Sequence, residues 1–291
     1  MHYEGMIIRP PSEAYSLLLQ VTVGCSHNRC TFCPTYKGTK FRIKPPEIVS
    51  ADIREAARRC GSVERVFLCD GDALIVPQRR LVEILTEIRR ELPGVKRIGA
   101  YANAKGILRK SPEELAVLRE LGLGIIYLGV ETGDEQLLAA IHKGATYEQL
   151  VTAGRRVKEA GITLSVTVLL GIGGVERSVA HATATARILT DIDPPYASAL
   201  TLMVVPGTPL WDDQQAGRFT LPDTFALLQE LGMIVAGANF TDCYFTSNHA
   251  SNYLPIRARL PQDKEEAVHL IAQVVEKGDR RLLRPEFMRA L

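Results

Sequence analysis

The sequence lacks most of the features that mark specialised protein classes. Its 35 Lys and Arg are nearly balanced by 33 Asp and Glu, so charge favours neither nucleic acid nor an anionic membrane as a partner. The segment 1–13 has no apolar stretch behind a basic one, as a targeting peptide would have. No internal repeat, low-complexity tract or obvious linker occurs. With 46% hydrophobic residues, the composition is that of a globular protein and excludes a disordered or fibrous one.

Long hydrophobic runs and abundant cysteine are also missing. The longest uncharged stretch, from Pro194 to Trp211, contains four prolines, so we expect a buried strand and a turn rather than a membrane span. Six cysteines in 291 residues are too few for a disulfide scaffold. We therefore expect a cytoplasmic protein, in which close-set cysteines are metal ligands or catalytic groups more often than disulfides.

Segments with the pattern of strands alternate with segments that have the spacing of helices. Six strand–helix units in succession predict a parallel sheet with right-handed crossovers. The expected strands span 15–23, 65–69, 97–102, 124–130, 162–170 and 197–205. The expected helices span 50–60, 81–92, 112–121, 146–161 and 177–189.

This alternation predicts an α/β fold, an incomplete barrel over residues 1–211 with a C-terminal extension over 212–291, as one structural unit. In the extension, 224–234 and 264–277 are expected to be helices around a polar stretch. An open, doubly wound parallel sheet is the alternative.

Polar residues and glycines follow the expected strands at the ends where α/β proteins carry their chemistry. The first strand leads into a loop with three cysteines. The later strands end at Asp70-Gly71-Asp72, Asn103, Glu131-Thr132-Gly133 and Gly171. Glycine or aspartate after a strand is also ordinary turn chemistry, but three thiols at the same edge are not.

The cysteine loop has the spacing CxxxxCxxC, with Cys25, Cys30 and Cys33. Three thiolates without a fourth suit an iron–sulfur cluster that keeps one iron open for a ligand. His27 could instead complete a Cys3His zinc site, and three unliganded core cysteines are the third possibility. The remaining cysteines form no second ligand motif and are expected to be buried small hydrophobes: Cys60, Cys69 and Cys243.

The series of motifs resembles the radical SAM (S-adenosylmethionine) superfamily over about residues 15–211. Phe32 stands before the last cysteine, as in the family, although one extra residue separates the first two cysteines. Four segments are similar to family motifs in the expected order, and the second and fourth of them resemble the coproporphyrinogen-oxidase-like and MiaB/Elongator-type branch. They are Cys69–Asp72, Gly129–Gly144, Leu169–Gly174 and Val205–Trp211.

The resemblance implies a partial (β/α)6 TIM-type barrel with a C-terminal helical and loop extension. It implies a 4Fe–4S cluster held by the three cysteines, and S-adenosylmethionine that is cleaved to methionine and a 5′-deoxyadenosyl radical. That radical would abstract hydrogen from an unidentified small-molecule or peptide substrate, with the protein supplying orientation and exclusion of water. A reductant such as flavodoxin or ferredoxin is the implied partner.

The resemblance also implies roles for single residues. Asp72, or the carbonyls of Asp70 and Gly71, would accept from the S-adenosylmethionine ammonium, and Glu131 would hold ribose hydroxyls. Lys143 would meet the carboxylate, although a solvated helix-end cation is an equal alternative. The implied cofactor-binding set is Phe32, Asp70, Gly71, Asp72, Glu131, Lys143, Thr167 and Gly171.

Substrate contacts are expected from two other places, one after the third strand and one in the C-terminal stretch. These candidates are Tyr101, Asn103, His249 and Tyr253. His249 is a candidate proton donor or acceptor, or else a hydrogen-bonded loop histidine. Two other functions stay open: a haem-binding or trafficking protein on this scaffold, and an RNA-modifying radical SAM enzyme. The second needs a basic face, whereas we expect the helix arginines to be solvated.

Overall fold

The computed structural model describes residues 1–290 and falls into two compact units, each described here on its own. The first unit contains residues 1–28, 35–128 and 152–164. The second contains residues 29–34, 129–151 and the chain from 165 onward. The predicted boundary at residue 211 does not coincide with this division and stays a prediction.

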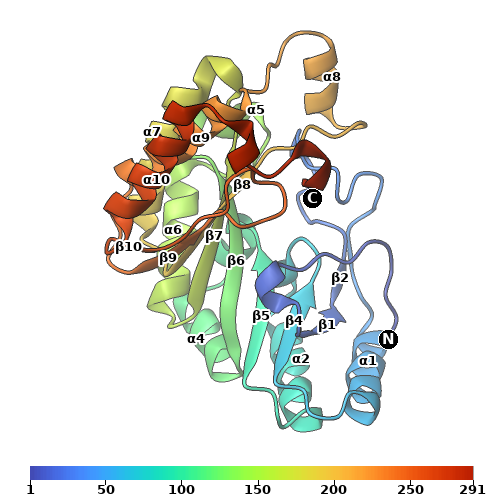
Figure 1. Ribbon diagram of the computed structural model, residues 1–291. Helices are drawn as coiled ribbons and strands as arrows, with labels where there is room; N and C mark the ends of the chain where they lie inside the picture. Colours follow the sequence, from blue (N-terminus) through green and yellow to red (C-terminus); the bar gives the residue numbers. More distant parts are fainter. Residues whose placement is uncertain (291) are drawn as a thin grey trace. The chain divides into compact units, whose positions relative to one another are not determined.

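The strands of the first unit run parallel to one another in chain order (Figure 1). Residues 66–69 are buried on both faces, as expected for a parallel sheet covered on both sides. A short antiparallel pair, β2 with β3, lies outside this sheet and flanks the cysteine loop in the sequence. The strands are β1 (Leu17–Gln20), β2 (Thr22–Val23), β3 (Arg42–Ile43), β4 (Arg65–Cys69), β5 (Arg97–Ala102) and β6 (Leu123–Glu131).

Helices follow these strands where the sequence has apolar residues three and four positions apart. In α2 that face is buried, and α4 begins at the predicted capping box, in which Ser111 and Glu114 bond each other's backbone amides. The helices are α1 (Pro46–Arg59), α2 (Gln78–Glu91), α3 (Ala104–Leu108), α4 (Pro112–Glu120) and α6 (Tyr147–Glu159), with a 3-10 turn η2 (Ala73–Ile75).

Residues 1–16 form an N-terminal strap, dark blue in Figure 1, which crosses the strands of the first unit and contains the 3-10 turn η1 (Pro11–Glu13). Glu13 is completely buried and accepts hydrogen bonds from Arg97 at 2.5 Å and Tyr127 at 2.6 Å. Ile7 packs against the aromatic core of the unit. The buried carboxylate is thus compensated by a guanidinium and a hydroxyl, as burial of a charge requires.

The second unit continues the strand series. β7 (Thr163–Leu170), β8 (Tyr196–Thr201) and β9 (Cys243–Thr246) are parallel neighbours, and β10 (Arg257–Leu260) is antiparallel to β9. The sequence predicted neither β9 nor β10, because each has only four residues and part of each is exposed. The expected strand 197–205 ends instead at Thr201, where the chain leaves the sheet toward Pro206.

The helices of the second unit include both of those predicted in the C-terminal extension. α9 and α10 pack on each other, and α9 also packs on α7. The helices are α5 (Glu135–Ala140), α7 (Gly174–Ile192), α8 (Pro209–Gln215), α9 (Thr224–Gly237) and α10 (Lys264–Lys277), followed by 3-10 turns η3 (Arg280–Leu282) and η4 (Glu286–Met288).

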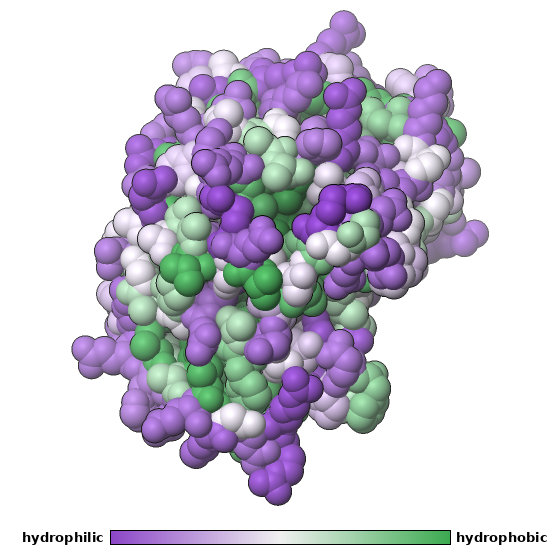
Figure 2. Space-filling view, turned by 90° about the horizontal axis from the view of Figure 1, so that it is seen from above, coloured by the Kyte–Doolittle hydropathy of each residue, from purple (hydrophilic) through white to green (hydrophobic). Residues whose placement is uncertain are grey.

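The strand order confirms the predicted fold class. Within residues 1–290, the eight strands of this sheet follow the order β1-β4-β5-β6-β7-β8-β9-β10, so each later strand of the chain is added on the same side of the one before. In a doubly wound sheet the strand order would reverse, so the order is that of a barrel-type α/β fold. No helix within residues 1–290 is long and apolar enough to span a membrane. Hydrophilic side chains cover most of the face shown in Figure 2, and hydrophobic residues form small groups among them.

Candidate functional site

The cysteine loop leaves β2 through Gly24, whose φ of 83° is in the region that favours glycine. Cys25, Cys30 and Cys33 are all half-buried, and none forms a disulfide. Residues 29–34 belong to the second unit, where the Thr31 amide donates to the Ile141 carbonyl at 3.0 Å. The loop therefore has fixed backbone contacts at the end of α5, in addition to its origin at β2.

These cysteines fit an iron–sulfur cluster by their chemistry and by the glycine that packs against the first of them. Three thiols lie within nine residues, and thiolate is the usual ligand of such clusters. A Cβ atom on Gly71 would lie only 2.7 Å from the Cβ of Cys25 and 3.1 Å from its Sγ, so only glycine leaves that thiol its position. Within residues 1–290 no three His, Cys, Asp or Glu side chains are gathered around a point that a single metal ion could take.

Asp70 begins the polar segment after β4 and is tied to the cysteine loop. Its φ of 72° is unusual for a residue with a side chain. Its Oδ2 accepts from the Gly24 amide at 2.8 Å and from the Gln20 side chain at 3.0 Å. Burial raises the pKa of Asp70, and these hydrogen bonds act in the opposite direction. The left-handed backbone is thus combined with a buried carboxylate that holds the residue before Cys25.

Asp72 is completely buried, and its carboxylate is turned toward protein groups. Its Oδ2 accepts from the Ser26 hydroxyl at 2.6 Å, and its Oδ1 accepts from the Asn103 amide at 3.3 Å. Burial raises the pKa of Asp72 to about 6, against the lowering effect of the hydrogen bonds from Ser26 and Asn103. The Asp72 side chain is therefore already engaged with Ser26 and Asn103.

The two candidates after the third strand differ in their surroundings. Tyr101 is half-exposed and meets Phe67 and Tyr127 edge to face, with ring centroids 5.0 and 6.0 Å away. Burial raises the pKa of Tyr101, so its hydroxyl stays protonated. Asn103 caps α3 through its Oδ1, which accepts from the Gly106 amide at 2.8 Å, and donates to Ser26 at 3.0 Å.

Glu131 and Lys143 form an ion pair in the second unit. Lys143 Nζ donates to Glu131 Oε1 at 2.9 Å, and both side chains are mostly buried. A Cβ on Gly129 would lie 2.3 Å from that carboxylate oxygen, so the glycine makes room for the pair. Glu131 also has a positive φ, 67°. Asp70 and Glu131 thus both stand at strand ends on left-handed backbone, which is disfavoured and concentrates at functional sites.

A polar network centred on the buried residues His181 and Glu230 lies at the ends of β6 and β7, and sequence reasoning missed it. His181 Nδ1 lies 2.7 Å from the Thr132 hydroxyl, and its Nε2 lies 3.2 Å from Glu230 Oε1. Glu230 also accepts from the Gly171 amide at 2.6 Å and from Ser178 at 2.6 Å. The signal available in the sequence was one carboxylate in an otherwise apolar helix, α9.

Three further residues belong to the implied cofactor-binding set: Phe32, Thr167 and Gly171. Phe32 packs against a buried apolar cluster of the second unit that includes Leu210. Thr167 is half-buried in β7, opposite Ser198. Gly171 has a φ of 81°, and a Cβ there would lie 2.7 Å from a side-chain atom of Leu227.

The C-terminal candidates lie on the loop between β9 and β10. His249 Nδ1 accepts from the Ser251 amide at 3.2 Å and lies 2.9 Å from its hydroxyl. Burial, together with the Arg284 guanidinium, lowers the pKa of His249. The imidazole is therefore neutral at pH 7, with its proton on Nε2.

Tyr253 and its neighbour Asn252 hold this loop in place. Tyr253 donates to Glu286 at 2.7 Å, and the Arg289 guanidinium stacks over its ring at 4.1 Å. Asn252 is buried and bonds Thr201 and Ala199 at the end of β8. The Tyr253 side chain thus contacts Glu286 and Arg289 of the C-terminal tail, whereas His249 has a protonated Nε2 that can donate a hydrogen bond.

The expectation for the other cysteines was right for two of the three. Cys69 and Cys243 are buried, and burial raises the pKa of each to about 12. The expectation was wrong for Cys60, which is exposed because it ends α1 as its C-cap and lies beyond the buried face of that helix.

Comparison with known proteins finds relatives of this chain. The sequence matches the Radical SAM superfamily over residues 19–184. It is 29% identical over 205 residues to biotin synthase of Paracidovorax citrulli, covering 69% of this chain and 55% of that one. It is 24% identical over 191 residues to the heme chaperone HemW of Bacillus subtilis, covering 65% of this chain and 50% of that one. The chain spans about half the length of these curated relatives.

Solved structures share the fold at low sequence identity. Methylornithine synthase (PylB) superposes with a TM-score of 0.55 at 20% identity, over 77% of this chain and 63% of that one. Coproporphyrinogen III oxidase (HemN) from Escherichia coli superposes with a TM-score of 0.53 at 14% identity, over 74% of this chain and 51% of that one. The family match covers more than half of the chain. The protein belongs to the radical SAM superfamily, whose members use a 4Fe–4S cluster and S-adenosylmethionine.

Proposed function

We propose that this chain is a radical SAM enzyme in which Cys25, Cys30 and Cys33 hold a 4Fe–4S cluster. The observation that carries the proposal is the set of three half-buried thiols within nine residues, with Gly71 packed against the first, where no other residue fits. The chemistry supplied by a bound cluster and S-adenosylmethionine is reductive cleavage to methionine and a 5′-deoxyadenosyl radical, which abstracts hydrogen from the substrate. The chain's own part is to bind, to orient and to exclude water.

The charged groups of the site suit the methionine and ribose parts of S-adenosylmethionine. Lys143 would meet the carboxylate and Glu131 the ribose hydroxyls, and in this structure the two neutralise each other at 2.9 Å. The carbonyls of Asp70 and Gly71 would accept from the ammonium. Gly171 ends β7, where the glycine-rich turn would lie beside the adenine. His249, neutral with its proton on Nε2, would donate a hydrogen bond from that nitrogen to substrate.

A small molecule or peptide suits the surface better than RNA. Several exposed arginines of α1 and α2 are paired with carboxylates of these helices, as in Arg59 with Glu55 at 3.0 Å and Arg90 with Glu91 at 2.9 Å. Such pairs neutralise the basic face that RNA binding would need. A reductant such as flavodoxin or ferredoxin would supply the electron.

Haem binding, suggested by the likeness to a heme chaperone, is less well supported at His249. A histidine that ligates a metal through one ring nitrogen normally donates a proton from the other. Here Nδ1 accepts from the Ser251 amide, so Nε2 carries the proton and is not a ready ligand.

The test is anaerobic reconstitution of the full chain with iron and sulfide. We expect about four irons per chain and release of 5′-deoxyadenosine from S-adenosylmethionine under dithionite. Cys25→Ala should lose the iron and the 5′-deoxyadenosine release. Cys60→Ala is the matched control at an exposed cysteine, and it should keep both the iron and the release. One tightly bound zinc without sulfide would overturn the proposal.

A further inference from the structure

We propose that Asp70, Gly71 and Asp72 form a clamp that fixes the direction of Cys25 before the cluster is bound. The clamp lies wholly within the first unit. Its carboxylates are positioning residues, because they act through Gly24 and Ser26 rather than on the cofactor. The inference rests on the proposed function only for the role of Cys25 as a cluster ligand.

The clamp holds the residue on each side of Cys25. Before it, Asp70 Oδ2 accepts from the Gly24 amide at 2.8 Å, and the Gly71 amide donates to the Gly24 carbonyl at 3.3 Å. After it, Asp72 Oδ2 accepts from the Ser26 hydroxyl at 2.6 Å. With both neighbours fixed, little more than the side-chain rotamer of Cys25 is left to vary.

The Gly71 backbone lies directly against the side chain of Cys25 and so limits its rotamers. The position of its missing Cβ lies 2.7 Å from the Cβ of Cys25, well inside van der Waals contact, so the two backbones are as close as glycine permits. No side chain can stand between the clamp and the thiol. The same close approach brings the carbonyls proposed for the S-adenosylmethionine ammonium next to the first cluster ligand.

The two carboxylates are themselves held in place. Asp72 is supported by Asn103, which donates its amide to Oδ1 at 3.3 Å and its side chain to Ser26 at 3.0 Å. A Cβ on Gly106 would lie 2.5 Å from Oδ1, so glycine is needed there as well. A buried carboxylate with several fixed donors has one favourable orientation, which makes it suitable as a positioning group.

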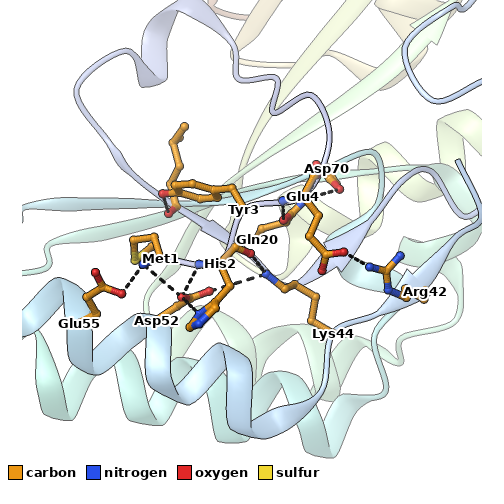
Figure 3. A network of polar contacts seen from close by, with 11 residues as sticks. Met1, His2, Tyr3, Glu4, Gln20, Arg42, Lys44, Asp52, Glu55 and Asp70 are labelled. Carbon is orange, nitrogen blue, oxygen red and sulfur yellow. Dashed lines mark hydrogen bonds and ion pairs between the residues drawn. The ribbon is translucent and has the colours of Figure 1, made fainter.

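Asp70 is supported from the N-terminal strap. Figure 3 shows the Gln20 side chain between Glu4 and Asp70: its amide nitrogen donates to the Glu4 carbonyl at 2.9 Å and to Asp70 Oδ2 at 3.0 Å. Its oxygen accepts from the Glu4 amide at 2.9 Å. The strap is thus connected to the residue before Cys25 through two buried side chains.

Pre-ordering one ligand lowers the entropy that the loop loses when three thiols converge on one cluster. The clamp therefore predicts that Cys25 is restrained in the metal-free protein. It also predicts that loosening the clamp changes the bound cluster, and not merely the stability of the fold.

The first measurement uses the full-length, metal-free protein. Alkylation of each cysteine by iodoacetamide is followed by peptide mass spectrometry, with exposed Cys60 as the internal reference. Ser26→Ala and Asp72→Asn should raise the rate at Cys25 about tenfold relative to Cys60, because they break the charge-assisted hydrogen bond after the cysteine. Ser26→Thr, which keeps the hydroxyl, should restore the wild-type rate.

The second measurement uses the reconstituted protein. In Ser26→Ala and Asp72→Asn, the rate of iron loss to EDTA should rise about tenfold, and the EPR spectrum of the reduced cluster should shift. Asp52→Asn is the matched control: it removes another buried carboxylate of the first unit, which binds His2 and lies 3.7 Å from Lys44 (Figure 3). It should lower stability without changing Cys25 alkylation or the EPR spectrum.

The outcomes separate the two proposals. If wild-type protein takes up no iron, the proposed function fails, while the alkylation rates still test the clamp. If wild type binds the cluster and the clamp variants match it in alkylation, iron loss and EPR spectrum, the clamp is overturned. Equal changes in Asp52→Asn would overturn it too, because the effect would then be general destabilisation.

Discussion

The Glu230 carboxylate in α9 accepts a hydrogen bond from the Gly171 amide at 2.6 Å, across 59 residues of chain. The contact joins the C-terminal extension to the turn that ends β7. The family match ends at residue 184, so Glu230 lies outside it. The proposed cofactor site is thus supported by a residue that the family pattern does not include.

Glu230→Gln should lower the free energy of unfolding by about 1–3 kcal/mol, because the new NH2 group cannot accept from Ser178 or Gly171. It should also weaken S-adenosylmethionine binding to the reconstituted protein, measured by equilibrium dialysis, because the Gly171 turn loses its support. Gln229→Glu, at the exposed neighbour on the same helix, should change neither quantity. Unchanged affinity in Glu230→Gln would separate this carboxylate from the cofactor site.

Asp72 should make stability depend on pH in the opposite direction from an ordinary paired carboxylate. Its pKa is raised to about 6 by burial, so the native state holds the proton more tightly than the unfolded chain does, where the pKa is about 3.9. The raised pKa therefore stabilises the native state fully below about pH 4. This stabilisation, ~2–3 kcal/mol of unfolding free energy, is lost as pH rises through about 6.

The comparison that isolates this effect is urea unfolding of wild type and Asp72→Asn without metal, at several values between pH 4 and pH 7. The difference in unfolding free energy, wild type minus variant, should fall as pH rises over that range. A difference that stays constant would mean that Asp72 ionises with an ordinary pKa.

Lys143 should contribute to S-adenosylmethionine binding through its charge. Lys143→Ala should raise the dissociation constant about tenfold, equivalent to ~1.4 kcal/mol, because the cofactor carboxylate loses its counter-ion. Lys96→Ala is the control, since that lysine is exposed and pairs with Glu64 at 2.6 Å. If Lys143→Ala binds as tightly as Lys96→Ala, Lys143 serves only as the ion-pair partner of Glu131.

Gly133 should tolerate no side chain. A Cβ there would lie 2.0 Å from the backbone oxygen of Ala184, and a helix backbone cannot give way as a flexible side chain can. Gly133→Ala should cost about 3 kcal/mol or more in unfolding free energy. Gly217→Ala, with a φ of 72° and open space, should cost only about 1 kcal/mol. Similar melting curves for both variants would contradict this.

Local features of the fold followed directly from the sequence. The strand Arg97–Ala102 and the helix Lys264–Lys277 have the expected bounds, because their apolar spacing is regular and their ends are marked. The capping box at Ser111 forms as predicted. By contrast, β9 and β10 could not be predicted, since a four-residue strand is stabilised by its neighbours in the sheet rather than by its own pattern.

The sequence by itself determined the superfamily, the order of the strand–helix units and the loop of Cys25, Cys30 and Cys33, because these depend on spacing along the chain. Only the tertiary structure decided that Asp72 turns toward Ser26, that Glu230 supports Gly171, and that His249 keeps its proton on Nε2. The first two depend on partners 46 and 59 residues away, and the third on the local backbone geometry at Ser251. A hydrogen bond is set by distance and angle in space, which spacing along the chain does not specify.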